Sequence, residues 1–161
     1  MGTVNNDMVS LYKNCIRSFN FTEYQVIMSV GKMTNKENFG EIKENIEVFE
    51  RVDQIAVLEK ADVFISHCGM NSVNESLYFG VPLIMLPQTG EQYGVAFRTA
   101  ELGAGLILKD TSPENILRAV KKIFSDASYR ENAQKISEDF KRCPGASGAA
   151  DKIAEVCKRR K

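Results

Sequence analysis

Short apolar runs recur along the chain and predict the strands of a sheet. They lie at Tyr24–Val30, Ile46–Phe49, Val63–Ser66, Val81–Leu86 and Leu106–Leu108. Each run is nearly continuous and rich in β-branched residues, which is typical of strands that are covered on both faces. The pattern therefore predicts buried parallel strands and disfavours an antiparallel sheet with one face in water.

Segments with helical periodicity separate these runs. Apolar positions spaced by three and four predict a helix face over residues 8–19. Further helices are predicted around Val57 and over residues 72–79, 93–102, 113–124, 128–140 and 146–156. The helix at Pro113 has a strong start signal, with a hydroxyl cap, a proline in the first turn and then a carboxylate. Strands that alternate with helices predict an α/β fold, a Rossmann-like doubly wound parallel sheet flanked by helices.

The amino-terminal region departs from this alternation. Gly2-Thr3 precedes a helix, as in a strand-to-helix turn, but no apolar run comes before it. We expect the first strand of the fold to be missing. The sequence is then a fragment of a larger protein, or the vacancy is filled by another chain. Pairing of the segment before Asn6 as a central strand would contradict this expectation.

The length and charge of the chain limit its class. Its 161 residues predict one domain, 1–161, and 43% hydrophobic residues are enough for a core. The 21 basic and 21 acidic residues give a net charge of zero, which gives no support for nucleic-acid binding. The basic ending at Lys158–Lys161 is interpreted as a solvated terminus, with a weak contact to anionic membrane as the alternative.

Cysteine usage and the absence of a leader favour a cytoplasmic protein. The four cysteines form no CxxC pair, so reduced thiols are expected. No apolar stretch approaches the ~20 residues of a membrane span. No metal site is expected either, because the acidic residues near the main motif are single.

The chain contains one histidine, His67. A site built from several imidazoles, such as an HExxH zinc site, is therefore excluded. A mechanism of the Ser-His-Asp or Cys-His type would depend on this one position.

The segment 61–97 contains no lysine or arginine, yet it holds the densest cluster of polar residues that could bind a ligand or take part in a reaction. A buried strand ends at His67, Gly69 permits a tight turn, and Asn71-Ser72 are expected to open a helix. Ligands of open α/β sheets bind beyond the carboxyl ends of strands. A helix N-terminus there offers N–H groups that suit phosphate, assisted by the Ser72 hydroxyl and the His67 ring.

Three further residues extend this candidate site. Glu75 follows Asn71 by four residues, one turn along the same helical face, and its carboxylate could accept both hydrogen bonds of a ribose diol. Glu91 and Gln92 end the loop after the next strand, at the same edge of the sheet, and could bind sugar hydroxyls.

Each residue also has a purely structural interpretation. His67 could be a core histidine, and Asn71 and Ser72 could be helix caps worth ~1 kcal/mol. Glu75 could be a surface residue, and Glu91 could only complement a helix dipole. Their ordered spacing, His-x-Gly-x-Asn-Ser-x-x-Glu followed by Pro-x-x-x-Glu-Gln, favours a common site.

This segment resembles the donor-binding signature of family 1 glycosyltransferases, and most of all that of the bacterial macrolide-type enzymes. The matching positions are Val52–Gln54, Leu58, Ala61-Asp62, Phe64–Ser72, Glu75, Gly80–Pro82, Pro87, Glu91-Gln92, Ala96, Arg98 and Leu102–Gly105. The likeness covers most of the chain and is strongest over residues 46–108.

The resemblance implies the C-terminal, nucleotide-sugar-binding half of a GT-B glycosyltransferase. It places His67 at the diphosphate, Asn71 and Ser72 at the phosphates, and Glu75 at the ribose. It assigns the donor sugar to Glu91 and Gln92 and the nucleoside to Gln54. The remaining donor-binding positions that it implies are Gly2, Thr3, Arg51, Val52, Gly69 and Met70.

Some positions depart from the family pattern. Many members have tryptophan, stacked on uracil, where this chain has Arg51, whose planar guanidinium could stack instead or point to solvent. The proline that commonly precedes Gln54 is replaced by Asp53. Cys68 as a nucleophile is disfavoured because the signature already accounts for this turn.

The catalytic base of the family is a histidine of the N-terminal half, so no catalytic residue is expected in this chain. The resemblance implies the donor half of an inverting enzyme that transfers a hexose from a UDP-sugar to a small-molecule or lipid hydroxyl, with no other cofactor. Alone, the chain is expected to bind the donor without catalysis. The alternatives are a separate donor-binding subunit that pairs with an acceptor-binding chain, and a non-catalytic nucleotide-sugar binding module.

Overall fold

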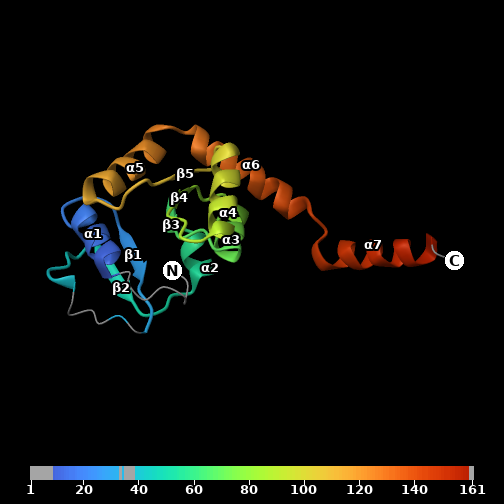
Figure 1. Ribbon diagram of the computed structural model, residues 1–161, viewed down its shortest axis with the longest axis horizontal. Coiled ribbons are helices and arrows are strands. Elements are labelled where there is room, and N and C mark those ends of the chain that lie inside the picture. The colour runs from blue at the N-terminus through green and yellow to red at the C-terminus, as the bar shows by residue number, and fades with distance from the viewer. Residues whose placement is uncertain (1–8, 33, 35–38, 160–161) are drawn as a thin grey trace.

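The computed structural model describes residues 9–32, 34 and 39–159 of the chain (Figure 1). Helices and strands alternate along it, as predicted. The elements are α1 (Val9–Phe19), β1 (Val26–Ser29), β2 (Ile46–Phe49), α2 (Gln54–Leu58), β3 (Phe64–Ser66), α3 (Met70–Tyr78), β4 (Leu83–Met85), α4 (Gly90–Glu101), β5 (Gly105–Ile107), α5 (Pro113–Ser125), α6 (Ser128–Arg142) and α7 (Gly145–Arg159). Every predicted apolar run overlaps a strand, although β5 begins one residue before the predicted run at Leu106.

All strand pairings among the described residues are parallel, and they form two sheets. One sheet has the order β1-β2, with Val26 opposite Ile46. The other has the order β3-β4-β5, with Phe64 opposite Leu83 and Leu83 opposite Gly105. A Cβ atom at Gly105 would lie 2.5 Å from the carbonyl oxygen of Leu83, so glycine permits this close pairing. The α/β class and the parallel sheets are confirmed.

Strand β4 shows why its sequence is apolar without alternation. Leu83, Ile84 and Met85 are all fully buried. Successive side chains of a strand point to opposite faces of the sheet. Accordingly, Leu83 and Met85 join one hydrophobic cluster, and Ile84 joins another with Leu86. The strand therefore separates two cores.

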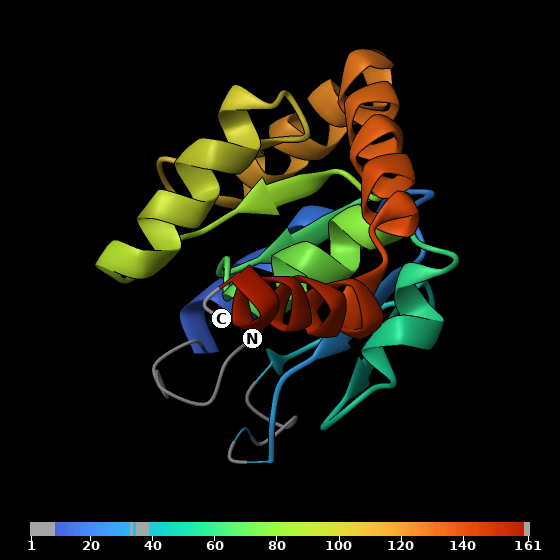
Figure 2. The ribbon, with the colours of Figure 1, turned by 90° about the vertical axis from the view of Figure 1, so that its right-hand side faces the viewer.

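Different helices cover the two cores. Buried residues of α1 and α5, such as Ile16 and Ile116, pack in the cluster that contains Ile84. Val73 of α3, Ala96 of α4 and Ala133 of α6 pack in the other. Figures 1 and 2 show the strands between these two groups of helices, with α4 and α6 together on one side.

The predicted cap of α5 is right in position and wrong in detail. Ser112 is the N-cap and Pro113 is the first helical residue. The Ser112 hydroxyl does not cap the helix, however, but donates to the Asp110 carboxylate at 2.6 Å. Hydrogen bonds from Ser112 and Asn115 lower the pKa of Asp110 to about 2.

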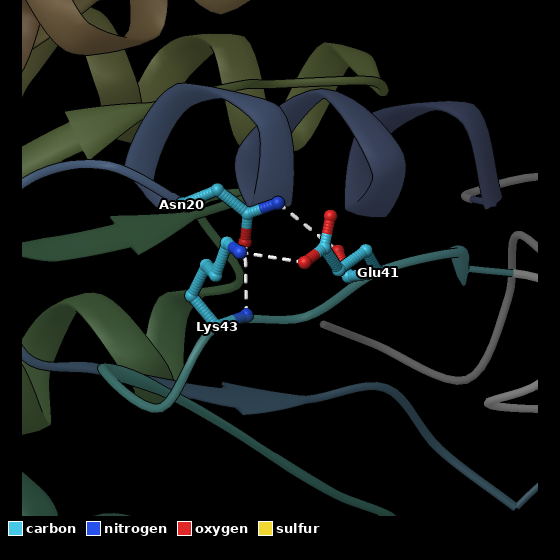
Figure 3. A network of polar contacts seen from close by, with 3 residues as sticks. All are labelled: Asn20, Glu41 and Lys43. Atoms are coloured by element: carbon cyan, nitrogen blue, oxygen red, sulfur yellow. Dashed lines mark hydrogen bonds and ion pairs between the residues drawn. The ribbon is translucent and has the colours of Figure 1, made fainter.

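Hydrogen bonds and an ion pair connect the segment before β2 to the end of α1 (Figure 3). The Asn20 side chain donates to the Glu41 carbonyl at 3.0 Å and accepts from the Lys43 amide at 3.2 Å. The Lys43 ammonium pairs with the Glu41 carboxylate at 2.5 Å. The Asn45 side chain donates to carbonyl groups of the turn after α1, including those of Phe19 at 2.9 Å and Tyr24 at 2.8 Å. These bonds fix where β2 begins.

Helix α7 extends away from the rest of the molecule in Figure 1. None of its described residues is buried, and Ile153 and Val156 are mostly exposed. Cys143 and Cys157 are exposed and Cys15 and Cys68 are buried, and all four are free thiols. No helix within residues 9–32 and 39–159 has the length and apolar character that a membrane span requires.

Candidate functional site

The predicted site residues that the structure describes lie on three segments, each made of the loop after a strand (β2, β3 or β4) and the start of the helix that follows it. Arg51, Val52 and Gln54 follow β2; His67 to Glu75 follow β3; Glu91 and Gln92 follow β4. Parallel strands place their carboxyl ends at the same edge of a sheet. Hydrogen bonds of the Gln54 side chain with Ser72 and Glu75 join the first two of these segments.

The turn after β3 has an unusual backbone. Cys68 has a φ of 67°, the left-handed conformation that favours glycine. The sequence pointed to Gly69 as the residue that permits the turn, and this is wrong for the dihedral angle, because Gly69 has a φ of −58°. The Cys68 amide donates to the Ser66 hydroxyl at 3.2 Å, and this bond helps to hold the strained residue.

Gly69 serves a different purpose, which is close packing of the histidine ring. A Cβ atom at this position would lie 3.0 Å from Nε2 of His67. A larger residue would therefore require the imidazole to shift by a few tenths of an ångström. The spacing His-x-Gly is thus explained by the contact between its two ends.

The Cys68 thiol is a structural group. It is fully buried, and it packs in the cluster with Val73 and Leu83. Burial raises its pKa to about 11, so the reactive thiolate is suppressed at neutral pH. The geometry supports the expectation that Cys68 is not a nucleophile.

Helix α3 begins two residues earlier than predicted. Gly69 is its N-cap and Met70 its first residue, so Asn71 and Ser72 lie within the first turn and do not open the helix. Gly69 has no side chain with which to cap, and the first turn carries no acidic residue. The backbone N–H groups of Met70, Asn71 and Ser72 precede the first helical bond, from Val73 to the Gly69 carbonyl. This end of α3 therefore has the donors and the positive dipole that suit an anion.

A hydrogen-bonded cluster joins α2 to α3. Nε2 of Gln54 donates to Oε2 of Glu75 at 2.5 Å and to the Ser72 hydroxyl at 3.3 Å. All three side chains are partly buried. Sequence reasoning selected all three residues but missed this contact, since a bond across 21 positions leaves no local signal.

His67 lies at the end of β3, next to this cluster along the chain. The residue is half-buried. Burial disfavours the imidazolium and lowers the pKa of His67 below its ordinary value of 6.5. The ring is therefore neutral at pH 7, and it can donate one hydrogen bond and accept another.

Glu91 and Gln92 lie in the first turn of α4. Thr89 is the N-cap and accepts from the Gln92 amide at 3.4 Å. The Gln92 side chain accepts from the Gln88 amide at 2.8 Å and so closes the loop after β4. Glu91 is exposed, at a position where a carboxylate also complements the helix dipole. Strand β4 pairs in parallel with β3, so the loop before α4 leaves the same edge of the sheet as the turn after β3.

The remaining predicted positions are less informative. Arg51 and Met70 are exposed and Val52 is partly buried. Gly2 and Thr3 lie outside the described residues. Across the part of the chain that the structure describes, no group of three histidine, cysteine or acidic residues could hold a metal ion.

The fold and the ordered site residues define a class, the C-terminal domain of GT-B glycosyltransferases. The chain belongs to the family described as the erythromycin biosynthesis protein CIII-like C-terminal domain, which matches residues 18–156.

Glycosyltransferases of other organisms are similar to this chain. It is 39% identical over 161 residues to the NDP-glycosyltransferase YjiC of Bacillus subtilis, a match that covers 99% of this chain and 41% of that protein. Over 88 residues it is 38% identical to human 2-hydroxyacylsphingosine 1-beta-galactosyltransferase, covering 53% of this chain and 16% of that enzyme. The chain therefore spans about two fifths of the length of the bacterial relative.

Solved structures show the same fold. The calicheamicin glycosyltransferase CalG4 matches with a TM-score of 0.90 and 26% identity, over 99% of this chain and 42% of that one. The glycosyltransferase of kitacinnamycin matches with a TM-score of 0.88 and 29% identity, over 96% and 41% respectively. The resemblance inferred from the sequence is confirmed.

Proposed function

We propose that this chain binds a nucleotide sugar, a UDP-sugar, at the carboxyl edge of β3 and β4. One observation carries the proposal. The uncapped N-terminus of α3 lies directly after His67, and one turn further along this helix Glu75 is held by Gln54. A diphosphate and a ribose are spaced in the same order along a nucleotide sugar.

In this proposal, different site residues bind different parts of the nucleotide sugar. The first-turn amides of α3, the side chains of Asn71 and Ser72 and a neutral His67 ring donate to the diphosphate. The Glu75 carboxylate accepts from the ribose hydroxyls, and Gln54 lies by the nucleoside. Glu91 and Gln92 accept from and donate to the donor sugar. Gly69, Met70, Arg51 and Val52 complete the lining.

The contact between Gln54 and Glu75 also predicts a change on binding. Gln54 Nε2 donates a hydrogen bond to one oxygen of the Glu75 carboxylate. Ribose hydroxyls would compete for that acceptor, so the amide of Gln54 turns toward the nucleoside as the donor enters. Gln54 thus keeps the carboxylate oriented until the ribose replaces it.

We further propose that the chain is the donor-binding half of an inverting glycosyltransferase that transfers a hexose to a small-molecule or lipid hydroxyl. Deprotonating an acceptor hydroxyl requires a base. His67 is committed to the diphosphate, so the base belongs to an N-terminal half or a partner chain. The length of the relatives supports this division. A robust transfer rate from the purified chain alone would contradict it.

Calorimetry with UDP, dTDP and UDP-glucose tests the binding proposal. Glu75→Ala is expected to weaken UDP binding by at least about tenfold, or ~1.4 kcal/mol, since hydrogen bonds to a charged group are lost. Glu101→Ala is the matched control, because Glu101 is an exposed helical glutamate that pairs with Arg98 at the far end of α4. Equal UDP affinity in Glu75→Ala and the intact chain would overturn the ribose assignment. No binding at ~1 mM ligand would leave a structural domain.

A further inference from the structure

Three helices that begin at the candidate site end beside one other helix, α6. Gln54 is the first residue of α2, Ser72 lies in the first turn of α3, and Gln92 lies in the first turn of α4. The opposite end of each helix leads into a turn that receives a hydrogen bond from a side chain of α6. Figure 1 shows α6 alongside α3 and α4. One helix thus contacts all three site-bearing helices at the ends that lie away from the site.

Asn132 connects α6 to the end of α4. Its Nδ2 atom donates to the Gly103 carbonyl at 3.4 Å. Gly103 directly follows the C-cap of α4 and has a φ of 67°, the left-handed conformation that ends many helices. A Cβ atom at Gly103 would lie 2.5 Å from Nδ2 of Asn132, so only glycine leaves room for this side chain. The end of α4 is therefore held directly against α6.

Ser137 makes the equivalent contact with α3. Its side chain is buried, and its hydroxyl donates to the carbonyl of Tyr78, the last residue of α3. Gly80 follows two residues later, and a Cβ atom there would lie 3.4 Å from Cα of Gln134. That atom belongs to the backbone of α6 and cannot swing aside as a side chain can. The end of α3 is thus also held against α6.

Arg130 reaches the turn after α2. Its Nη1 atom donates to the carbonyls of Ala61 and Asp62, both at 3.3 Å. These two residues lie between α2 and β3. Hydrogen bonds from a charged donor are stronger than those between neutral groups. Each of the three helices therefore has its own polar contact with α6.

The contacts lie on two sides of α6. Arg130, Gln134 and Ser137 are spaced by four and three residues, so they share one face of the helix. Asn132 lies outside this spacing, on the other side of the buried Ala133. Ala133 itself packs in the hydrophobic cluster to which α3 and α4 contribute. A change in the tilt of α3 or α4 would consequently break a contact with α6.

We propose that α6 sets the relative positions of α2, α3 and α4, and that Asn132 and Ser137 are positioning residues for nucleotide-sugar binding. Because a helix is a rigid element, a shift at one end also moves the other end. Asn132 acts through α4 on Glu91 and Gln92, and Ser137 acts through α3 on the residues that bind the diphosphate and the ribose. This inference rests on the proposed function, which assigns parts of the ligand to these helices.

Two ligands that differ only by the sugar distinguish these roles in calorimetry. Asn132→Asp keeps the shape of the side chain but replaces the donor with an oxygen that repels the Gly103 carbonyl. It is expected to lower the affinity for UDP-glucose about threefold and to leave the affinity for UDP unchanged, because only glucose meets α4. Ser137→Ala is expected to lower both affinities about threefold, since both ligands carry the diphosphate and the ribose.

A control variant separates positioning from a general loss of stability. Asn115 lies on α5 and donates to the Asp110 carboxylate, away from the contacts of α6. Asn115→Ala is expected to lower the thermal midpoint and to leave both affinities unchanged. An equal loss of affinity for UDP and UDP-glucose in Asn132→Asp would overturn the proposal, because the variant would then act on the whole chain. Unchanged affinities in Ser137→Ala would overturn it as well.

NMR spectra of the chain without ligand decide the proposal even if the intact chain binds neither ligand. Absence of binding at ~1 mM would contradict the proposed function alone. Asn132→Asp is expected to shift the amide resonance of Tyr93, near the start of α4, and Ser137→Ala that of Val73, near the start of α3. Asn115→Ala should shift neither resonance. Changes confined to the residues around each substitution would show that α6 does not set the positions of the site helices.

Discussion

The two sheets differ in how completely their neighbours enclose them. In the β3-β4-β5 sheet the middle strand is fully buried on both faces, and three helices cover one of those faces. In the β1-β2 sheet buried and exposed residues are mixed in both strands. The candidate site is built on the loops that leave the enclosed sheet, together with one loop from the other. The site therefore draws on both the fully enclosed sheet and the partly exposed one.

The same substitution in each sheet gives the largest expected contrast. Ile84→Ala should lower the free energy of unfolding by about 3 kcal/mol, because it leaves a cavity between two cores. Ile27→Ala should cost less than about 1 kcal/mol, since the side chain is 48% exposed. Urea unfolding monitored by circular dichroism measures both values. Equal losses would show that the two sheets are equally enclosed.

The second-largest effect on stability is expected at Cys68, the residue with left-handed backbone conformation in the turn after β3. Cys68→Val should lower the free energy of unfolding by about 2 kcal/mol more than Cys68→Ala, because a β-branched side chain is strained at a φ of 67°. It should also weaken UDP binding, since the turn places His67 beside α3. Chemical denaturation and calorimetry on the two variants make the comparison. If the two variants have equal free energies of unfolding and equal UDP affinities, the backbone of this turn can adopt another conformation at no energetic cost.

A smaller difference in stability between the two sheets is expected when a buried hydroxyl group and an exposed one are removed. The Ser76 hydroxyl donates to the Val81 carbonyl at 2.8 Å and is fully buried, so Ser76→Ala should cost about 1 kcal/mol. The Ser29 hydroxyl makes a 3.4 Å bond to the Glu50 carbonyl near solvent, and Ser29→Ala should change stability by less than ~0.5 kcal/mol. Thermal melts of the two variants test this order. A larger loss for Ser29→Ala would reverse it.

The smallest expected effect is the dependence of ligand affinity on pH through His67. Burial lowers the pKa of His67 in the free chain, and a bound diphosphate would raise it. The complex then takes up a proton as pH falls, so affinity for UDP-glucose should rise a few-fold from about pH 8 to about pH 6. His67→Gln should remove this dependence. Binding that weakens with falling pH in the intact chain would contradict the contact between His67 and the phosphates.

The central strands could be predicted from sequence because burial on both faces leaves an uninterrupted apolar run. The ends of elements were less accurate. Helix α3 begins at Met70 and not at Ser72, since its cap is Gly69, which has no side chain to signal a start. The run Tyr24–Val30 contains only a four-residue strand, because β2 pairs with residues 26–29 alone.

The site was predictable as a set of positions and not as a set of contacts. The spacing of His67, Gly69 and Glu75 identifies one turn and one helix face, which are local features. The bond from Gln54 to Glu75 depends on how two distant loops meet. The positive φ at Cys68 was missed because glycine, its immediate neighbour, is the more common residue in that conformation.

The absence of lysine and arginine from residues 61–97 has a consequence for how this surface selects a ligand. A pocket lined by cations attracts any polyanion and loses affinity steeply as added salt competes for those cations. Backbone amides and a neutral imidazole carry no net charge to be screened. Recognition at the end of α3 therefore depends less on formal charge than it does in a cation-lined pocket, and affinity should fall less steeply as salt is added.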